Sequence, residues 1–455
     1  MVTVCLAVEC ASRVLPMRKI LSRGCKRGLC TFVPLSPAHR GGDGKQRRRL
    51  TASPFTNSLR RKAVDAAPPF SSNLAHSLSF GAAGEEGWRD RCQTGVHLCI
   101  GVFDGCHLGH QLLFETVRRQ AASDAGATLC LTFDPHPDSV IRAMKVEKEK
   151  EKSGGQTHNE IADKTQGTDY SAELIWPLER RIRTLTDREN FDAVSVDTFD
   201  QDYAKQTPED FLQRIFLRFP SLKSVTVGED FVFGARAQGN VEILQEICSR
   251  RGIDVLCVGD LKWNGSRVSS STIRRRLREG QVGDAAKLLG IPSFSLSGKF
   301  VSGKRLGRTI GFPTLNIRWT PQCSPRFGVY AVELKPWHVG GEGLPGVANF
   351  GLRPTVNDAD PEPLLEVHLL EPQGEAGEGQ ADGQQSSRSS TLPYLSAEEG
   401  HGAAVALLDF LRPEKKFNSL DELKEQLKTD CQRAKEVHEA RRSAGFLPAF
   451  KSQFK

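Results

Sequence analysis

The segment Gly101–His110, GVFDGCHLGH, sets the fold of the first half of the chain. It directly follows a short apolar run, His97–Gly101, and it opens an amphipathic stretch, Gly109–Ala122. Its glycines let the backbone approach a ligand closely, and a helix N-terminus behind them presents free N–H groups to phosphate. The segment therefore predicts a strand, a glycine-containing turn and a helix that together suit a nucleotide.

The same alternation continues outward from this segment. Further strand candidates are the apolar runs Ala127–Phe133, Asp192–Val196, Ser224–Gly228 and Ile253–Val258. The amphipathic stretches between them are Leu178–Arg188, Pro208–Arg218 and Asn240–Arg251. Strands that alternate with helices favour a parallel sheet covered on both faces. We therefore expect an α/β domain with a doubly wound parallel sheet over residues 93–290.

Two groups of side chains in this half fit phosphate chemistry. His107 and His110 lie three residues apart at a helix start, so both imidazoles face the same way and can stabilise a phosphorus under attack. A single histidine there is more often a cap or a packing residue. The segment Val268–Arg274, VSSSTIR, places hydroxyls and an arginine at another helix start. Such serines are equally typical of plain helix capping.

From about residue 292 the pattern becomes rich in β-strands. The candidates are Phe294–Val301, Val329–Leu334, Gly346–Asn349, Leu364–Leu370 and Val405–Leu411, and one helical pattern runs from Leu420 to about Ala444. We expect a small antiparallel barrel with a C-terminal helix over residues 291–445.

The segment Gly298–Asn316, GKFVSGKRLGRTIGFPTLN, is the candidate site of this second half. Its spaced glycines and basic residues suit a loop over phosphates, although a glycine-rich barrel turn would look the same. Thr314 and Asn316 lie two residues apart, hence on one face of an extended chain, where their oxygens suit Mg²⁺ beside phosphate.

The charge of the chain is concentrated at its start. Residues 1–72 hold 14 Lys and Arg against three acidic residues, within a total charge of +7. An Arg-rich, Ser-rich and acid-poor segment is typical of an organellar transit peptide. We expect residues 1–80 to be a transit peptide without ordered structure, directing the chain to the plastid stroma or the mitochondrial matrix, with the plastid favoured. A disordered basic tail without an addressing role is the alternative.

The composition of the chain excludes several classes of protein. With 38% hydrophobic and 26% charged residues the chain is neither a membrane protein nor wholly disordered, and the acidic balance after residue 72 argues against a nucleic-acid partner. Twelve cysteines are scattered without a C-x-x-C pair, so we interpret them as reduced thiols. The polar stretches 145–169 and 371–400 are predicted to be disordered insertions.

Several motifs together resemble one known family. GVFDGCHLGH and VSSSTIR are similar to the two signatures of the HxGH nucleotidyltransferase superfamily, and Thr132–Pro137 (TFDPHP) and Val227–Gly234 (VGEDFVFG) resemble its FAD synthetase module. Gly311–Asn316 (GFPTLN) resembles the riboflavin kinase pattern G-x-P-T-A-N. Landmarks around it agree: Gly328–Ala331, Gly346–Thr355, Leu365–His368 and Leu411–Phe417. Residues 95–445, apart from the two insertions, are thus similar to bifunctional riboflavin kinase/FAD synthetases.

This resemblance implies a nucleotidyltransferase domain followed by a six-stranded antiparallel barrel, and two reactions. Riboflavin would be phosphorylated by ATP to FMN, and FMN adenylylated by a second ATP to FAD, with Mg²⁺ as the metal. In the adenylyltransferase half the implied residues are catalytic His107, His110 and Arg274, ATP-binding Gly101, Phe103, Asp104, Gly109, Ser269, Ser270 and Ser271, and flavin-binding His136, Pro137, Asp230 and Phe231. In the kinase half they are the base Glu366, ATP-binding Gly298, Gly303 and Gly307, and Thr314 and Asn316 for ATP and Mg²⁺.

The chain departs from the family pattern in the kinase half. Leu315 stands where Ala is usual, either crowding ATP or pointing to the core, and His401-Gly402 occupies the place of an expected D-L/F-Y-G segment. Ser271 replaces the usual Thr of the first half. A FAD synthetase with a degenerate kinase domain is therefore the alternative within the family. A flavin- or nucleotide-binding regulator and a nucleotidyltransferase with another acceptor are the alternatives outside it. We expect a monomer or a weak homo-oligomer.

Overall fold

The computed structural model describes residues 78–152, 174–303, 310–319, 323–337, 342–352, 363–370 and 401–444. Residues 1–77 of the predicted transit segment, the predicted insertion 371–400, and residues 153–169 of the other insertion lie outside them. In the described ranges, no helix is both long and apolar enough to cross a membrane.

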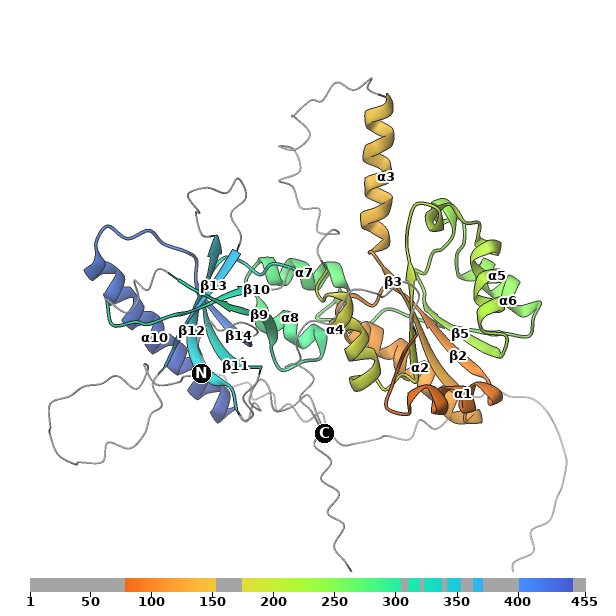
Figure 1. Ribbon diagram of the computed structural model, residues 1–455, viewed down its shortest axis with the longest axis horizontal. Coiled ribbons are helices and arrows are strands. Elements are labelled where there is room, and N and C mark those ends of the chain that lie inside the picture. The colour runs from red at the N-terminus through yellow and green to blue at the C-terminus, as the bar shows by residue number, and fades with distance from the viewer. Residues whose placement is uncertain are drawn as a thin grey trace, which may run out of the picture. The chain divides into compact units, whose positions relative to one another are not determined.

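The first domain is built on a six-stranded sheet (Figure 1). Neighbouring strands are parallel except at one edge, where β1 pairs antiparallel with β4. In sheet order the strands are β1 (Leu78–Phe80), β4 (Ala193–Thr198), β3 (Ala127–Asp134), β2 (Val96–Ile100), β5 (Leu222–Gly228) and β6 (Asp254–Val258). The five strands expected from the apolar runs are all present, which confirms the parallel sheet.

Helices cover both faces of this sheet. Alternate strand residues face opposite sides, so Leu98 joins one apolar core and its neighbour Cys99 joins another. Side chains of α2 and α4 pack on the Cys99 side, and those of α1, α5 and α6 include members of the Leu98 core. The helices are α1 (Gly84–Thr94), α2 (Leu108–Asp124), α3 (Pro137–Lys152), α4 (Leu178–Arg183), α5 (Pro208–Arg218) and α6 (Val241–Ser249). The doubly wound arrangement is confirmed.

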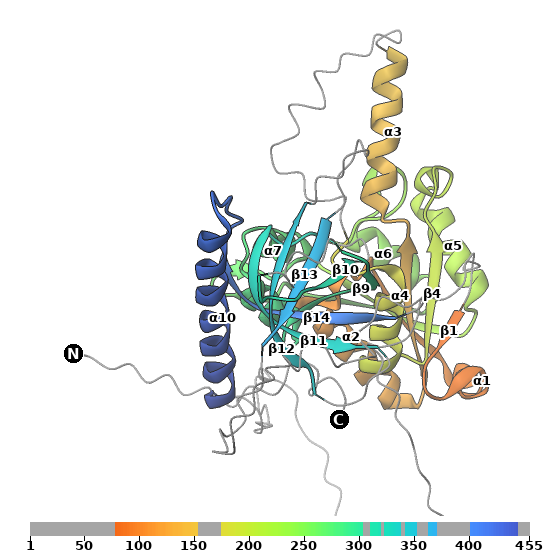
Figure 2. The ribbon, with the colours of Figure 1, turned by 60° about the vertical axis from the view of Figure 1, so that its left-hand side comes forward.

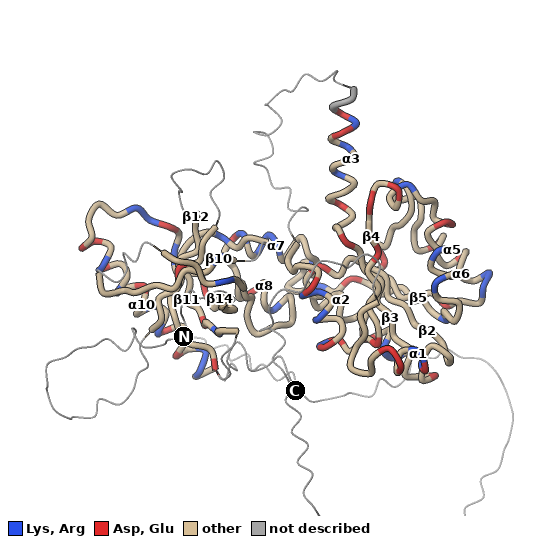
Figure 3. Tube along the Cα trace, viewed as in Figure 1, with Lys and Arg blue, Asp and Glu red and all other residues tan. Residues whose placement is uncertain are grey.

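The structure differs from the sequence-based expectation at two places in this domain. The sheet begins at Leu78, within the segment 1–80 that was expected to lack ordered structure and before the expected domain boundary at 93. The sequence does not reveal this start, because β1 and α1 are short elements with little apolar periodicity, and within α1 only Trp88 is buried. Residues 145–152, expected to be disordered, continue the helix α3. Lys and Glu alternate along this end of α3 (Figure 3), and such residues favour a helix even without packing.

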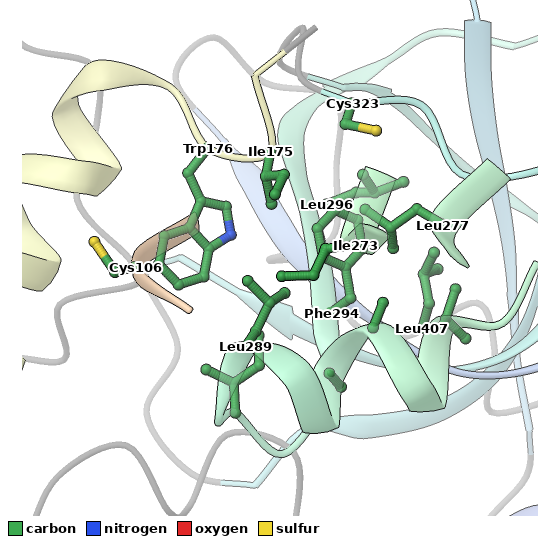
Figure 4. Packing of buried hydrophobic residues seen from close by; sticks show 14 of the residues in the cluster. Cys106, Ile175, Trp176, Ile273, Leu277, Leu289, Phe294, Leu296, Cys323 and Leu407 are labelled. Atoms are coloured by element: carbon green, nitrogen blue, oxygen red, sulfur yellow. The ribbon is translucent and has the colours of Figure 1, made fainter. Parts of the chain in front are cut away.

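A connecting module follows β6. It consists of the hairpin β7 (Lys262–Trp263) and β8 (Ser266–Arg267) and the helices α7 (Ser270–Arg278) and α8 (Val282–Leu289). Figure 4 shows Ile273, Leu277 and Leu289 of this module beside other buried side chains of one apolar cluster. The cluster also contains Trp176 from before α4 and Phe294 from the first barrel strand. The module therefore shares its core with both domains.

The second domain is a closed antiparallel barrel of six strands. In barrel order the strands are β10 (Leu315–Trp319), β13 (Pro363–Leu369), β12 (Leu344–Leu352), β11 (Gly328–Pro336), β14 (Gly402–Arg412) and β9 (Phe294–Val301). The inward side chains, such as Phe350, Leu365 and Ile317, are buried and lie in one cross-strand row. The predicted barrel is confirmed.

The C-terminal helix α10 (Leu420–Ser443) lies against the outside of the barrel (Figure 2). Ser419 caps it, as its hydroxyl accepts a hydrogen bond from the Glu422 amide. On the barrel side Asp430 is fully buried and receives a two-pronged ion pair from Arg412 of β14, with the shortest N···O distance 2.7 Å. This buried pair fixes the helix to the strand.

Candidate active sites

The turn after β2 brings the first site's side chains to the carboxyl end of the sheet. Phe103 and Gly105 adopt positive φ angles of 53° and 80°, which bend the chain sharply before α2 begins at Leu108. A Cβ on Gly109 would lie 3.2 Å from the His107 ring and 3.3 Å from the Val268 carbonyl. The glycine therefore lets the N-terminus of α2 pack against the segment that enters α7.

His107 and His110 form a stacked pair at this helix start. Their ring centroids are 3.6 Å apart with planes 17° from parallel, and the Phe103 ring meets His110 edge-on at 5.3 Å. The His107 ring accepts a hydrogen bond from the His110 amide and so caps α2. Within the described residues, the buried Nδ1 of His110 has no hydrogen-bond partner. The sequence left capping and phosphate binding open for these histidines. The structure shows that His107 caps the helix.

Both imidazoles are neutral at physiological pH. Burial lowers the pKa of His107 to about 3, and the positive charges of Arg267 and Arg274 act in the same direction. Burial, together with His107 and Arg267, also lowers the pKa of His110. A neutral imidazole offers one N–H donor and carries no charge. The pair can therefore donate hydrogen bonds to phosphate oxygens, while positive charge must come from arginine.

Asp104, in the turn that precedes the histidines, forms a buried ion pair with Arg274 of α7. The distance between Arg274 Nη1 and Asp104 Oδ2 is 2.6 Å, and both side chains are nearly inaccessible. Asp104 also accepts hydrogen bonds from the backbone amides of Ile175 and Trp176. Burial raises the pKa of Asp104, and these amides and Arg274 oppose the rise. The pair ties the turn after β2 to α7 and to the segment before α4.

The three serines at the start of α7 make different contacts. Ser269 caps the helix by accepting from the Thr272 amide, as the capping interpretation expected. Ser270 donates to the carbonyl oxygen of Asp104 at 2.9 Å. Ser271 lies 3.5 Å from an Arg274 nitrogen. The structure thus brings Ser269, Ser270 and Ser271 to the same end of the sheet as Asp104.

The expected flavin-binding residues lie on two other loops. His136 precedes Pro137, the first residue of α3, and its Nδ1 accepts from the Asp138 amide at 3.1 Å. Burial lowers the pKa of His136, and Asp104 and Arg274 are close enough to influence it. Beyond β5, Asp230 is exposed, and the Phe231 ring stacks on Phe233 at 5.5 Å.

Sequence reasoning missed two arginines here. Arg267 bridges Asp230 and Asp260, with N···O distances of 2.6 and 2.8 Å, and its charge lies close enough to lower the pKa of both histidines. Arg181 of α4 is fully buried. It donates to two carbonyl oxygens at the carboxyl end of the sheet, that of Val102 after β2 at 2.7 Å and that of Phe133 near the end of β3 at 3.3 Å. Arg267 directly precedes VSSSTIR, so that motif was the available signal, whereas Arg181 sits in an ordinary amphipathic pattern.

The kinase candidates lie on the outer face of the barrel. Asn316 of β10 is directly opposite Glu366 of β13, and Glu366 is in turn opposite Asn349 of β12. Directly opposed side chains lie roughly 4.5–5.5 Å apart at Cβ. The three form one half-buried polar row across neighbouring strands. Asn349 lies in one of the motifs that resemble the riboflavin kinase family, but the sequence alone assigns it no role.

The glycine-rich segment meets this row. A Cβ on Gly303 would collide with the side-chain amide of Asn316, so the glycine lets the backbone lie directly against that amide. Gly298 is packed against the backbone of β10, which makes it a barrel contact, and Gly307 lies outside the described residues. Asn316 Oδ1 is buried and, within the described part of the chain, has no hydrogen-bond partner. Thr314 is exposed and precedes the first residue of β10.

Leu315, the unusual residue of this motif, packs against the apolar core. It is opposite Val367, which is fully buried inside the barrel. Of the two interpretations of Leu315, the core position is confirmed. The place of the missing D-L/F-Y-G segment is the start of β14 at Gly402, and the residues before His401 lie outside the described ranges.

Comparisons with known proteins agree with this division. Residues 89–272 match the family model of FAD synthetase, and residues 291–438 match that of riboflavin kinase. Proteins named bifunctional riboflavin kinase/FMN adenylyltransferase are similar over most of the chain. The Escherichia coli K12 protein is 32% identical over 76% of this chain and 93% of its own length, and the Bacillus subtilis protein is 30% identical over 74% and 90%.

A solved structure has the same fold. The chain described as a macrolide-efflux protein from Streptococcus pneumoniae superposes with a TM-score of 0.56 at 24% identity, covering 75% of this chain and 94% of that one. At this identity the likeness concerns the fold alone. The sequence matches and the two site geometries lead to one conclusion: the chain belongs to the family of bifunctional riboflavin kinase/FMN adenylyltransferases.

Proposed function

We propose that the barrel domain transfers the γ-phosphoryl group of ATP to riboflavin, and that the α/β domain transfers the adenylyl group of a second ATP to the resulting FMN. One observation carries this proposal. The chain holds two separate polar groups, one with a carboxylate beside amides and one with neutral imidazoles beside arginines. The two transfers need these two different chemistries.

In the kinase half, Glu366 acts as the general base. The 5′-hydroxyl of riboflavin is a poor nucleophile at neutral pH, so a carboxylate that accepts its proton assists attack on the γ-phosphorus. The proton passes to Glu366, the new O–P bond forms and ADP leaves. Asn316 and Asn349 flank Glu366 on neighbouring strands and orient the groups around it.

Mg²⁺ fits the same place. The buried Asn316 Oδ1 has no partner among the described residues, and the Thr314 hydroxyl lies two residues before it. Hard oxygen donors of this kind, together with phosphate oxygens, suit Mg²⁺. When bound, the ion would neutralise charge on the phosphates of ATP. Thr314 and Asn316 would hold the ATP, and the backbone of Gly303 lies directly against the Asn316 amide.

In the adenylyltransferase half, no base is required, because the phosphate of FMN is already an anion. Its oxygen attacks the α-phosphorus of ATP and pyrophosphate leaves. The neutral imidazoles of His107 and His110 donate hydrogen bonds to the α-phosphate oxygens at the N-terminus of α2. Arg267 supplies the nearby positive charge, and the Asp104–Arg274 pair holds the turn in place.

A labelling experiment tests the order of the two transfers. The full chain is incubated with riboflavin, Mg²⁺ and ATP radiolabelled at either the γ- or the α-phosphate, and the flavins are separated by chromatography. We expect γ-label in both FMN and FAD, and α-label in FAD alone. No labelled flavin from riboflavin, together with α-labelled FAD once FMN is supplied in its place, would instead support the FAD synthetase with a degenerate kinase half.

We also propose, from the charge of residues 1–72, that the chain is imported into the plastid or the mitochondrion. A monomeric or weakly homo-oligomeric state is a separate proposal. A fluorescent fusion of residues 1–80, imaged beside organelle markers, tests the first point. Cytosolic fluorescence would contradict it. Light scattering on the purified chain tests the second.

A further inference from the structure

His368 lies beside the kinase site and has no role in the mechanism above. It follows Glu366 by two residues in β13, so both side chains are on the outer face of the barrel. The ring is half-buried, and its Nδ1 is 2.9 Å from the carbonyl oxygen of Pro313. The Phe312 ring meets it edge-on, with centroids 5.2 Å apart. Two independent contacts therefore fix the imidazole against the turn that precedes β10.

The chemistry of the contact defines the donor. A carbonyl oxygen only accepts hydrogen bonds, so Nδ1 of His368 carries the hydrogen and donates it to Pro313. The peptide group that joins Pro313 to Thr314 is planar. Holding the oxygen of that group in place therefore also fixes the nitrogen and Cα of Thr314.

Thr314 depends on this contact because of where it lies. The ladder pairs of β10 begin at Leu315, which is opposite Val367, so Thr314 precedes the paired residues. Pro313 has no N–H with which to anchor the turn. The His368 contact thus ties the turn to β13, the strand that also carries Glu366.

We propose that His368 is a positioning residue of the kinase half, whose Nδ1–H holds the Pro313 carbonyl and thereby sets the Thr314 hydroxyl against the phosphates of ATP. The inference rests on the proposed roles of Thr314 and Glu366. It assigns His368 no contact with substrate.

A pair of variants of the full chain isolates the donor. His368→Leu removes the N–H, whereas His368→Asn keeps one near the position of Nδ1. We expect the Leu variant to raise the KM for ATP in FMN formation about five- to tenfold, as expected for one hydrogen bond, and to change the KM for riboflavin little. The Asn variant should recover most of the loss. FMN adenylylation, measured in the same chains, serves as the control for folding and should stay unchanged.

Coupling to Thr314 is the decisive test. In a Thr314→Ala background, His368→Leu should raise the KM for ATP less than about twofold, because the group that it positions is gone. An equal loss in both backgrounds would overturn the inference, as would an unaffected His368→Leu chain beside an impaired Thr314→Ala chain. Full kinase activity of Thr314→Ala would instead overturn the proposed role of Thr314 on which the inference rests.

Discussion

The two sites of this chain differ in how the fold positions the residues that would bind phosphate. The adenylyltransferase site is assembled from loops and helix starts and is held by buried charges, chiefly the Asp104–Arg274 pair. The kinase site is a half-exposed row on barrel strands, set by the register of Asn316, Glu366 and Asn349. In the kinase site, strand register positions the side chains. In the adenylyltransferase site, a buried ion pair holds the loop that carries them. Substitutions should therefore act locally in the barrel and more widely in the α/β domain.

The largest expected effect is at Glu366. Glu366→Gln removes the proton acceptor while keeping the shape, so FMN formation should fall by a factor of about 10² to 10⁴. FMN adenylylation should be unchanged, because that reaction is assigned to the α/β domain and the substitution keeps the shape of the side chain in the barrel. Steady-state rates of the two half-reactions, measured separately, check both statements. A kinase rate within a few-fold of the starting chain would show that Glu366 is not the base.

His110→Ala should produce the reverse pattern. Removing one donor at the α-phosphate should lower adenylylation roughly 10²- to 10³-fold and leave FMN formation intact. FMN should therefore accumulate when the variant is given riboflavin and ATP. His438→Ala, in the C-terminal helix α10 and outside both sites, is the matched control. Normal FAD output from His110→Ala would remove the imidazole pair from the mechanism.

The buried ion pair should give a smaller loss of activity but a larger loss of stability. Asp104→Asn leaves Arg274 buried without its counter-charge, which costs about 3–5 kcal/mol of unfolding free energy in comparable cases. Arg412→Met should destabilise the barrel in the same manner, through Asp430. Denaturant unfolding with separate probes for each domain would distinguish the two effects. Small changes in both variants would contradict the stabilising role of these two buried pairs.

The stability of the adenylyltransferase domain should also depend on pH, through the buried imidazole of His107. The pKa of His107 is about 3 in the folded chain against 6.5 for the free group, so between these values the unfolded chain binds a proton that the folded chain does not. The free energy of unfolding should therefore fall as pH drops below about 6.5, by at most about 1.4 kcal/mol per pH unit from this group. His107→Asn keeps a good cap and removes the titration, and its curve should be flatter. Parallel curves would refute the neutral, buried imidazole.

The smallest effect is expected at Leu315. Because this side chain packs on the barrel core, Leu315→Ala should cost about 1–2 kcal/mol of stability and leave the KM for ATP unchanged. Thermal unfolding and kinase kinetics measure the two quantities. A lower KM for ATP would mean that Leu315 crowds the nucleotide after all.

Much of this architecture could be predicted from sequence. The apolar runs from His97 onward predicted every parallel strand, and the spacing of His107 and His110 predicted their shared direction. Long-range pairing could not be predicted in this way. Nothing local indicates that Arg274 is paired with Asp104, or that Arg181 binds two strand-end carbonyls, because such partners meet only in the folded chain. β1 was missed because a three-residue edge strand carries no periodicity.

The polar row Asn316–Glu366–Asn349 of the kinase site shows another limit of prediction from sequence. Thr314, Asn316 and Glu366 followed from motifs, but the residue opposite Glu366 on its other side is set by register, which a single sequence does not reveal. Asn349 therefore received no role until the strands were paired. The prediction of disorder for residues 145–152 was wrong for a different reason. Their composition indicates disorder, but their high helix propensity extends α3 to Lys152.

Mixing two inactive chains tests most directly whether one polypeptide holds two separate sites. Neither Glu366→Gln nor His110→Ala should convert riboflavin and ATP to FAD by itself. Together they should, because FMN released by the His110→Ala chain can be adenylylated by the Glu366→Gln chain. FAD that appears in the mixture with a lag for FMN build-up is the predicted result. A mixture that forms FMN without FAD, or either variant alone forming FAD from riboflavin, would contradict it.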